Sequence, residues 1–273
     1  MFLVKENTVL NPNTVRMTVE APMIARKAKP GQFVIIRGDE KGERIPLTIS
    51  GYDAAGGTVT VIYQTVGAST LKLAEIPAGG YLCDIVGPLG RASELDGIKK
   101  AAVVGGGLGC AIAYPQAKYL HEHGASVDII AGFRNKDIII LEDEMRAACE
   151  NLVLLTDDGS NGHKGLVTDG AKYDVVIVIG PPIMMKFVCR LTKEYGIKTV
   201  VSMNPIMIDG TGMCGGCRVS VGGEMKFACV DGPDFDGHLV DFDELMKRNR
   251  MYRDEEQHDC NLFREAKERE HNA

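Results

Sequence analysis

Apolar and polar residues alternate along the first third of the chain. The alternation is clear at residues 14–19 and 57–63, and residues 32–37 form a short, almost continuous apolar run. Pro-Gly and Gly-Gly pairs separate these segments, as is typical of strands joined by tight turns. Short strands at this spacing predict a β-barrel over residues 1–97.

The period of the pattern changes after about residue 98. A buried strand at 99–104 precedes a glycine-rich turn at 105–109, a helix at 111–123 and a second strand at 126–132. This order is a βαβ unit, which binds a dinucleotide pyrophosphate at the amino end of its helix. The fingerprint is imperfect because Cys110 stands at its third glycine position, and a turn of this kind also serves purely structural roles. The sequence therefore predicts a doubly wound α/β domain over residues 98–205.

Two later loops support a nucleotide site in this second domain. The loop at 156–165, which contains Asp158, follows one buried strand, and Gly180-Pro-Pro follows the apolar strand at 174–179. A doubly wound sheet binds its ligand beyond the carboxyl ends of its strands, where both loops are expected to lie. The alternative for Gly180-Pro-Pro is a simple stop before a helix.

Composition is ordinary for a globular protein of two domains and a small appended module. The chain has 273 residues, of which 45% are hydrophobic and 25% charged. A formal net charge of −6 gives no electrostatic reason to bind nucleic acid or an anionic membrane. No apolar run reaches the ~18 residues of a membrane span, and the first apolar run is too short for a signal peptide. We therefore expect a cytoplasmic protein without nucleic-acid or membrane partners.

The most specific chemistry lies between residues 209 and 229. Asp209, Cys214, Cys217 and Cys229 have the spacing Asp-x4-Cys-x2-Cys-x11-Cys. This is the plant-type [2Fe–2S] pattern with an aspartate in place of the first cysteine. Aspartate is anionic and can bind ferric iron, although a harder ligand should alter the reduction potential. Four glycines fit such a loop, because they allow positive φ angles and free backbone amides; they are Gly210, Gly212, Gly215 and Gly216.

Two other readings of these residues stay open. A structural zinc ion usually takes two Cys-x2-Cys knuckles or a Cys/His set, whereas this chain has one knuckle and one later cysteine. The other is buried thiols without metal. The remaining cysteines are scattered singly, which favours reduced thiols over disulfides. We expect an iron–sulfur module at 206–240 and a charged, helical tail at 241–273, either solvated or part of a docking surface.

The motifs of the three regions resemble the ferredoxin-reductase superfamily and occur in its order. Those that carry the resemblance are Pro30-Gly-Gln-Phe-Val, Arg44-x-Pro46-Leu47-Thr48, Gly67-x-Ser69-Thr70, the turn at 105–109 and Gly180-Pro181. The segments 204–219 and 227–241 more closely resemble the small subunit of NADH-dependent ferredoxin:NADP oxidoreductase, also known as the sulfide dehydrogenase small subunit.

This resemblance implies a flavin barrel, a nicotinamide nucleotide domain and a [2Fe–2S] cluster held by the aspartate and three cysteines. FAD would have Arg44, Ser69 and Thr70 at its diphosphate and Leu47 and Thr48 near its isoalloxazine, with Pro46 and Gly67 in the same motifs. The pyrophosphate of NAD(H) would lie on Gly105, Gly107 and Gly109, with Asp158 and Gly180 nearer the nicotinamide and Pro181 in the same motif as Gly180. Many members carry a cysteine before the Gly-Pro pair, where this chain has Ile179, so no role for that thiol is implied.

The family also implies a larger partner subunit that carries flavin and [4Fe–4S] clusters. Coupling of NAD(H) to NADP(H) and ferredoxin would need that partner. The alternative is the electron-transfer subunit of dihydroorotate dehydrogenase, which usually has four cysteines at its cluster. Use of NADP(H) also stays open, because Arg134 and Lys136 follow the second strand of the nucleotide domain, where a cation can accept a 2′-phosphate. A zinc-stabilised, non-redox nucleotide-binding protein is the remaining class.

Overall fold

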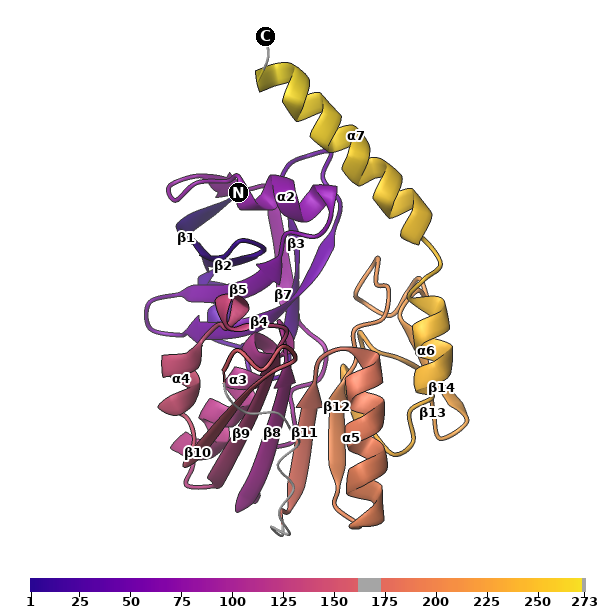
Figure 1. Ribbon diagram of the computed structural model, residues 1–273. Coiled ribbons are helices and arrows are strands. Elements are labelled where there is room, and N and C mark those ends of the chain that lie inside the picture. The colour runs from indigo at the N-terminus through magenta and orange to yellow at the C-terminus, as the bar shows by residue number, and fades with distance from the viewer. Residues whose placement is uncertain (162–172, 272–273) are drawn as a thin grey trace.

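The computed structural model describes residues 1–161 and 173–271, which form two sheets, a short hairpin and the helices around them (Figure 1). The first sheet is antiparallel and curls into a half-barrel with the strand order β6-β1-β2-β5-β4-β3-β7. Its elements are β1 (Phe2–Asn11), β2 (Thr14–Glu20), α1 (Pro22–Ala25), β3 (Phe33–Arg37), β4 (Ile45–Asp53), β5 (Thr58–Gln64), α2 (Ala68–Ala74), β6 (Tyr81–Leu82) and β7 (Asp84–Leu89). The strands predicted at 14–19, 32–37 and 57–63 are confirmed.

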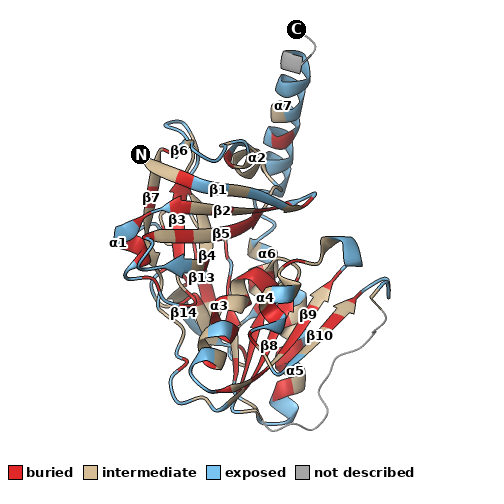
Figure 2. Ribbon diagram, turned by 90° about the vertical axis from the view of Figure 1, so that its left-hand side faces the viewer, coloured by how far each residue is buried: buried red, intermediate tan, exposed pale blue. Residues whose placement is uncertain are grey.

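Alternate residues of these strands fill the interior of the half-barrel, because successive side chains of a strand point to opposite faces. Met17 of β2, Val34 and Ile36 of β3 and Val59 and Val61 of β5 belong to one buried cluster. The red segments of Figure 2 follow this interior along the strands.

The second sheet is the predicted doubly wound α/β sheet. Its strand order is β10-β9-β8-β11-β12-β15, with every pairing parallel except that of β15. Its elements are β8 (Lys100–Gly106), α3 (Gly109–Glu122), β9 (Ser126–Phe133), η1 (Lys136–Ile138), α4 (Glu142–Arg146), β10 (Asn151–Thr156), β11 (Val175–Ile179), α5 (Pro182–Glu194), β12 (Thr199–Ser202) and β15 (Asp234–Asp236). Because β9 and β11 lie on opposite sides of β8, the topological switch point falls between β8 and β11.

Both faces of this sheet are covered, so its central strands are apolar on both sides. Ala101 and Val103 of β8 pack with α3 on one face. Their neighbours Ala102 and Val104 pack on the other face with residues of α5 and α6 (Phe242–Arg248). The half-barrel meets this domain directly, since Nη1 of Arg16 lies 3.4 Å from Oε1 of Glu144.

The C-terminal region does not form a separate body. The hairpin of β13 (Arg218–Val221) and β14 (Glu224–Phe227) stands alone, but β15 pairs with β12 and extends the α/β sheet. The range predicted as a helical tail, 241–273, contains α6 and α7 (Arg253–His271), and α7 reaches back to α2 (Figure 1). There Sγ of Cys260 lies 3.7 Å from the carbonyl oxygen of Val66. None of the helices in the described part of the chain is long and apolar enough to cross a membrane.

Candidate functional site

A β-hairpin brings together two of the three predicted cysteine ligands. Cys217 directly precedes β13 and Cys229 lies two residues after the end of β14, and Gly222 and Gly223 join the strands with φ angles of 62° and 81°. Positive φ at both central residues is what a two-residue hairpin turn of type I′ requires. The hairpin places Sγ of Cys217 3.2 Å from Sγ of Cys229, and both residues are buried. The eleven residues between the two cysteines therefore form this hairpin and Ala228 after it.

The other two predicted ligands share the loop before the hairpin. Asp209 is half-buried and Cys214 is exposed. Gly210, Gly212 and Gly215 have positive φ, as predicted, whereas Gly216 contributes its N–H, which lies 3.4 Å from Sγ of Cys214. The glycines thus have two uses here, to turn the backbone and to offer amides to sulfur.

Hydrogen bonds favour the anionic forms of both side chains in this loop. The hydroxyl and N–H of Thr211 and the N–H of Met213 lower the pKa of Asp209, and the positive charge of Arg44 adds to the effect. The N–H groups of Gly216 and Asp209 lower the pKa of Cys214. Both groups are therefore prepared as anionic ligands.

Burial has the opposite effect on the pKa of Cys229 under the hairpin. The apolar surroundings and the thiol of Cys217 raise the pKa of Cys229. A buried thiol of this kind becomes a thiolate when a metal ion replaces its proton.

The predicted ligands lie as two pairs and not around one point. Asp209 and Cys214 form one pair in the loop, and Cys217 and Cys229 form the other. Among residues 1–161 and 173–271, no three His, Cys, Asp or Glu side chains are grouped to hold a single metal ion. A [2Fe–2S] cluster takes two protein ligands on each of its two irons, and paired ligands fit that demand.

The cysteine pair lies against the outer face of β3. Phe33 and Ile35 form one buried cluster with Cys217, Ala228 and Cys229. The sequence patterns did not single out this face. The signal was the uninterrupted apolar run at 33–36, which indicates a strand covered on both sides.

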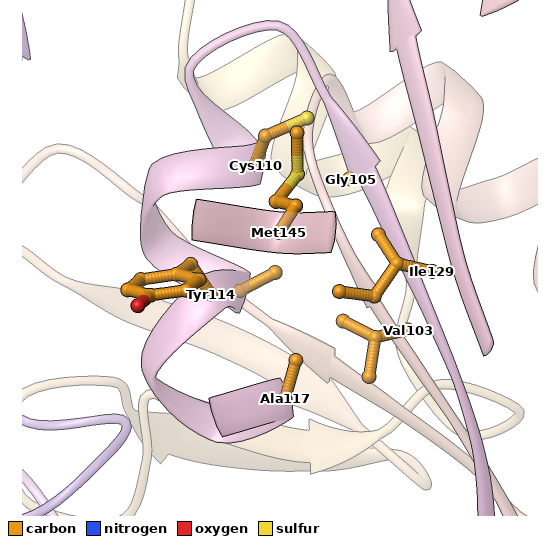
Figure 3. A pocket seen from close by; sticks show the side chains of 8 residues that line it. Val103, Gly105, Cys110, Tyr114, Ala117, Ile129 and Met145 are labelled. Carbon is orange, nitrogen blue, oxygen red and sulfur yellow. The ribbon is translucent and has the colours of Figure 1, made fainter. Parts of the chain in front are cut away.

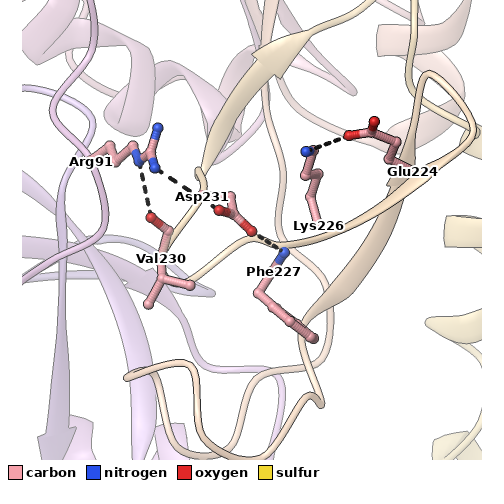
Figure 4. A network of polar contacts seen from close by, with 6 residues as sticks. All are labelled: Arg91, Glu224, Lys226, Phe227, Val230 and Asp231. Carbon is pink, nitrogen blue, oxygen red and sulfur yellow. Dashed lines mark hydrogen bonds and ion pairs between the residues drawn. The ribbon is translucent and has the colours of Figure 1, made fainter.

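Polar contacts also hold the turn after β14 to the half-barrel (Figure 4). Nε of Arg91 donates to the carbonyl oxygen of Val230 at 3.1 Å, and Nη2 lies 4.0 Å from Oδ1 of Asp231. Oδ2 of Asp231 accepts from the N–H of Phe227 at 2.7 Å. These contacts fix the backbone on both sides of Cys229.

The residues predicted to hold FAD lie on β4 and α2 of the half-barrel or, for Arg44 and Gly67, directly before them. In the β3–β4 ladder Thr48 is opposite Phe33, and Pro46 is opposite Ile35. Leu47, between these two residues, is opposite Val34. The predicted isoalloxazine contacts therefore lie one strand away from the cysteine pair.

The predicted diphosphate contacts pair with acidic side chains. Arg44 is exposed, with Nη1 at 3.8 Å from Oδ2 of Asp84, and Ser69 donates to Glu43. At the start of α2, Oγ1 of Thr70 accepts from the N–H of Gly67 at 3.0 Å. The long Arg44 pair leaves guanidinium donors free for a phosphate, while Glu43 would have to release Ser69.

The predicted nucleotide glycines meet at the switch point of the second sheet. Gly105 pairs with Ile179, and a Cβ placed on Gly109 would lie 2.1 Å from the carbonyl oxygen of Ile179. A Cβ on Gly180 would lie 3.1 Å from the backbone of Gly106. Gly107 is open and has a φ of 56°. Because these glycines lack side chains, the start of α3 can approach the end of β11 closely. Pro181 lies beside the same contact.

Cys110, the departure from the dinucleotide fingerprint, is part of the packing between β8 and α3. Its side chain faces a small apolar cavity of about 10 Å³ (Figure 3), a volume that suits at most one water molecule. Burial raises the pKa of its thiol to about 12. Cys110 therefore fills space beside Gly105 and has no exposed, reactive sulfur.

Asp158 lies apart from the switch point. It follows β10, an edge strand that β9 and β8 separate from β11, and its N–H donates to the carbonyl oxygen of Arg134 at 3.3 Å. Ser160 donates to Oδ1 of Asp158 and also accepts from the N–H of Lys136 at 2.9 Å. The structure thus joins Asp158 to the backbone of Arg134 and Lys136 after β9 and does not bring it beside Gly180. Residues 162–165 of the same predicted loop lie outside the described residues.

A buried carboxyl group that sequence reasoning missed joins all three regions. Oδ2 of Asp234 in β15 accepts from Oγ of Ser93 at 2.5 Å and from Nε2 of Gln116 in α3 at 3.3 Å. A Cβ on Gly31 of the half-barrel would lie 3.3 Å from the same oxygen. Burial raises the pKa of Asp234, and the hydroxyls of Ser93 and Ser202 partly offset the effect.

Comparison with known proteins agrees with this arrangement. Residues 204–241 match the iron-sulfur cluster binding domain of dihydroorotate dehydrogenase B. The "uncharacterized protein in adh 3′ region" of Clostridium beijerinckii is 54% identical, over 94% of this chain and 92% of that protein. A dihydroorotate dehydrogenase B (NAD(+)) electron transfer subunit homolog of Thermotoga maritima is 46% identical, over 87% and 86%.

A solved structure of NADH-dependent reduced ferredoxin-NADP oxidoreductase, an enzyme of flavin-based electron bifurcation, is also similar. It is 41% identical with a TM-score of 0.90, and the match covers 96% of this chain and 98% of that one. The predicted ferredoxin-reductase-like fold and the family resemblance are confirmed. The chain therefore belongs to the family of flavin and iron–sulfur oxidoreductase subunits that includes the small subunit of NADH-dependent ferredoxin-NADP oxidoreductase and the electron-transfer subunits of dihydroorotate dehydrogenase B.

Proposed function

We propose that this chain transfers electrons between NAD(H) and a [2Fe–2S] cluster by way of bound FAD. The observation that carries the proposal is the position of β3. Its partner strand β4 holds the predicted flavin contacts Leu47 and Thr48, and its outer face covers Cys217 and Cys229. A two-electron donor and a one-electron cluster need an intermediate that accepts hydride and releases single electrons, and FAD, when bound, supplies that chemistry.

The cluster ligands would be Asp209 and Cys214 on one iron and Cys217 and Cys229 on the other. Support comes from the two pairs, from the hydrogen bonds that stabilise the loop anions and from the apolar cover over the cysteine pair. The cover keeps water from the buried sulfurs, while the loop pair stays near the surface. A partner protein would therefore exchange electrons with the cluster on the side of the exposed Cys214.

The flavin diphosphate would lie on Arg44, Ser69 and Thr70, and residues 1–97 would be the flavin domain. At the start of α2 the N–H of Gly67 donates to Oγ1 of Thr70, and that hydroxyl donates to the carbonyl oxygen of Gly67, so these bonds fix the turn beside the anion. Pro46 removes one backbone donor from β4 beside this site. Residues 98–205 would be the nucleotide domain, 206–240 the cluster module and 241–273 the tail, with β15 fastening the module to the nucleotide domain.

NAD(H) would bind at the switch point between β8 and β11. Gly105, Gly107 and Gly109 allow a pyrophosphate to approach the amino end of α3, and Gly180 with Pro181 lies beside them. Asp158, Arg134 and Lys136 lie after β9 and β10, where a doubly wound fold places the adenosine ribose. Asp158 would then serve the ribose and not the nicotinamide, and its negative charge favours NAD(H) over the 2′-phosphate of NADP(H).

In the cell this chain would act as one branch of a complex with a larger subunit that holds flavin and [4Fe–4S] clusters and couples NAD(H) to NADP(H) and ferredoxin. The Asp-x4-Cys-x2-Cys ligand set favours this assignment. The dihydroorotate dehydrogenase assignment is the second candidate, because the matching iron–sulfur domain carries that description.

Anaerobic purification of the single chain tests the proposal. We expect bound FAD, two irons with two sulfides, and bleaching of the flavin by NADH in preference to NADPH. The chain should pass electrons from NADH to artificial dyes but reduce neither NADP nor ferredoxin until its partner is added. A colourless protein without iron would rule out the redox function. Partner-dependent dihydroorotate oxidation would select the second candidate.

A further inference from the structure

Strand β3 serves two different cores with its two faces. Val34 and Ile36 point into the half-barrel, and Phe33 and Ile35 point toward the cysteine pair. Ile35 and Ile36 are equally buried, with exposed fractions of 1% and 0%. Two neighbouring isoleucines of one strand thus differ only in the core that each one supports.

The loop that carries Asp209 rests on the outward isoleucine. A Cβ placed on Gly210 would lie 3.0 Å from both Cδ1 and Cγ1 of Ile35 and 3.4 Å from Cδ1 of Leu89. Gly210 is buried and has a φ of +80°, a conformation that other residues rarely adopt. The backbone of Gly210 therefore lies directly on the side chain of Ile35.

This contact acts on the residue before the glycine. The peptide plane between Asp209 and Gly210 is rigid, so a fixed Gly210 also fixes the Cα of Asp209. Thr211 and Met213 then hold its carboxylate by hydrogen bonds. The position of the carboxylate therefore depends on the half-barrel as well as on its own loop.

We propose that Ile35 is a positioning residue of the iron–sulfur site, which seats Gly210 and thereby sets the carboxylate of Asp209 relative to Cys214. The inference rests on the proposed cluster. Groups outside the ligand set orient the ligands, and their loss weakens metal binding even though they never touch the metal. Because Ile35 belongs to the flavin domain, the same contact also fixes the cluster loop against that domain.

The test compares Ile35→Val with Ile36→Val in the purified holoprotein. Each change removes one Cδ1 atom from β3, on opposite faces. The measurements are the rate of iron loss to a chelator, the EPR spectrum of the reduced cluster, its midpoint potential and the unfolding midpoint. We expect both variants to unfold at similarly lowered temperature. Only Ile35→Val should change the EPR spectrum and potential, and it should lose iron roughly tenfold faster.

A second pair of variants keeps the test decisive if valine at position 35 or 36 prevents folding. Ile35→Leu and Ile36→Leu keep the side-chain volume and move only the branch point. The same difference in spectrum and iron loss is expected between them.

Identical spectra and iron-loss rates on the two faces would overturn the role of Ile35 while leaving the cluster in place. Absence of iron from the unmutated protein would instead refute the proposed function itself. The two failures are therefore distinguishable in one set of preparations.

Discussion

The sulfur atoms of Cys217 and Cys229 lie 3.2 Å apart, with eleven residues between them in the chain. The hairpin of β13 and β14 accounts for that distance, and Phe33 and Ile35 cover the pair from the half-barrel. A buried pair of thiols held side by side by one hairpin is placed to supply two ligands of one iron.

Replacement of Cys229 by serine should therefore remove iron without removing flavin. The hydroxyl is a poorer ligand for iron than the thiolate, whereas the predicted flavin contacts Leu47 and Thr48 lie on the neighbouring strand β4. Iron, sulfide and FAD contents of the purified variant are the measurements. Cys260→Ser is the matched control, because Cys260 is also buried but lies on α7. Equal loss of iron in both variants would contradict the assignment.

Asp209 should be replaceable by cysteine but not by alanine. Asp209→Cys restores the common four-cysteine set and should keep the cluster with a changed EPR spectrum and potential. Asp209→Ala leaves one iron short of a ligand, and we expect the cluster to be lost during purification. Asp39→Ala is a suitable control, since Asp39 accepts from the N–H two residues ahead at 2.8 Å, as Asp209 does in its own loop. Unchanged spectra in both Asp209 variants would remove this residue from the ligand set.

The patterns that predicted this site were local ones. The Asp-x4-Cys-x2-Cys-x11-Cys spacing reflects a glycine-rich loop and a hairpin that closes through Gly222 and Gly223, so neighbours in sequence determine it. The alternation at β2 and β5 and the βαβ pattern from β8 to β9 are local in the same way. These elements were predicted within a few residues of their observed bounds.

The parts that the sequence did not predict depend on contacts between distant segments. No pattern in residues 234–236 shows that β15 pairs with β12, and none in residues 33–36 shows what covers the outer face of β3. Asp158 was expected near Gly180, yet the strand order puts β9 and β8 between the strands that these residues follow, β10 and β11. Its role at the nucleotide stays a prediction.

The carboxyl group of Asp234, whose Oδ1 is buried, should make the stability of the fold depend on pH. Its neighbours Ser93, Gln116 and Ser202 are all uncharged, and burial raises its pKa above the ordinary 3.8. The unfolded chain releases this proton at lower pH than the folded chain does. The contribution of Asp234 to the free energy of unfolding is therefore fully present below pH 3.8 and is lost as pH rises through the pKa of the folded state. The loss is about 1.4 kcal/mol for each unit by which folding raises the pKa.

Asp234→Asn keeps the shape of the side chain and removes the titration. Denaturant unfolding at pH 5 and pH 8 should show that the variant gains stability relative to the unmutated protein at the higher pH. Asp53→Asn, a change in an exposed turn, is the control and should not alter the difference between the two pH values. A variant that follows the unmutated protein at both pH values would show that Asp234 is ionised throughout.

Among the glycines of the predicted nucleotide site, Gly109 should tolerate replacement by alanine least. An added Cβ would lie 2.1 Å from the carbonyl oxygen of Ile179 and 2.9 Å from the Cα of Gly180, so α3 would have to move away from β11. We expect Gly109→Ala to cost roughly 3 kcal/mol of stability and to abolish flavin bleaching by NADH. Gly132→Ala in β9 is the matched control, because its Cβ would lie 3.8 Å from its nearest neighbour, the carbonyl oxygen of Gly105. Unfolding curves and NADH titrations of the two variants check the prediction, and a Gly109→Ala protein that binds NADH normally would place the pyrophosphate away from the amino end of α3.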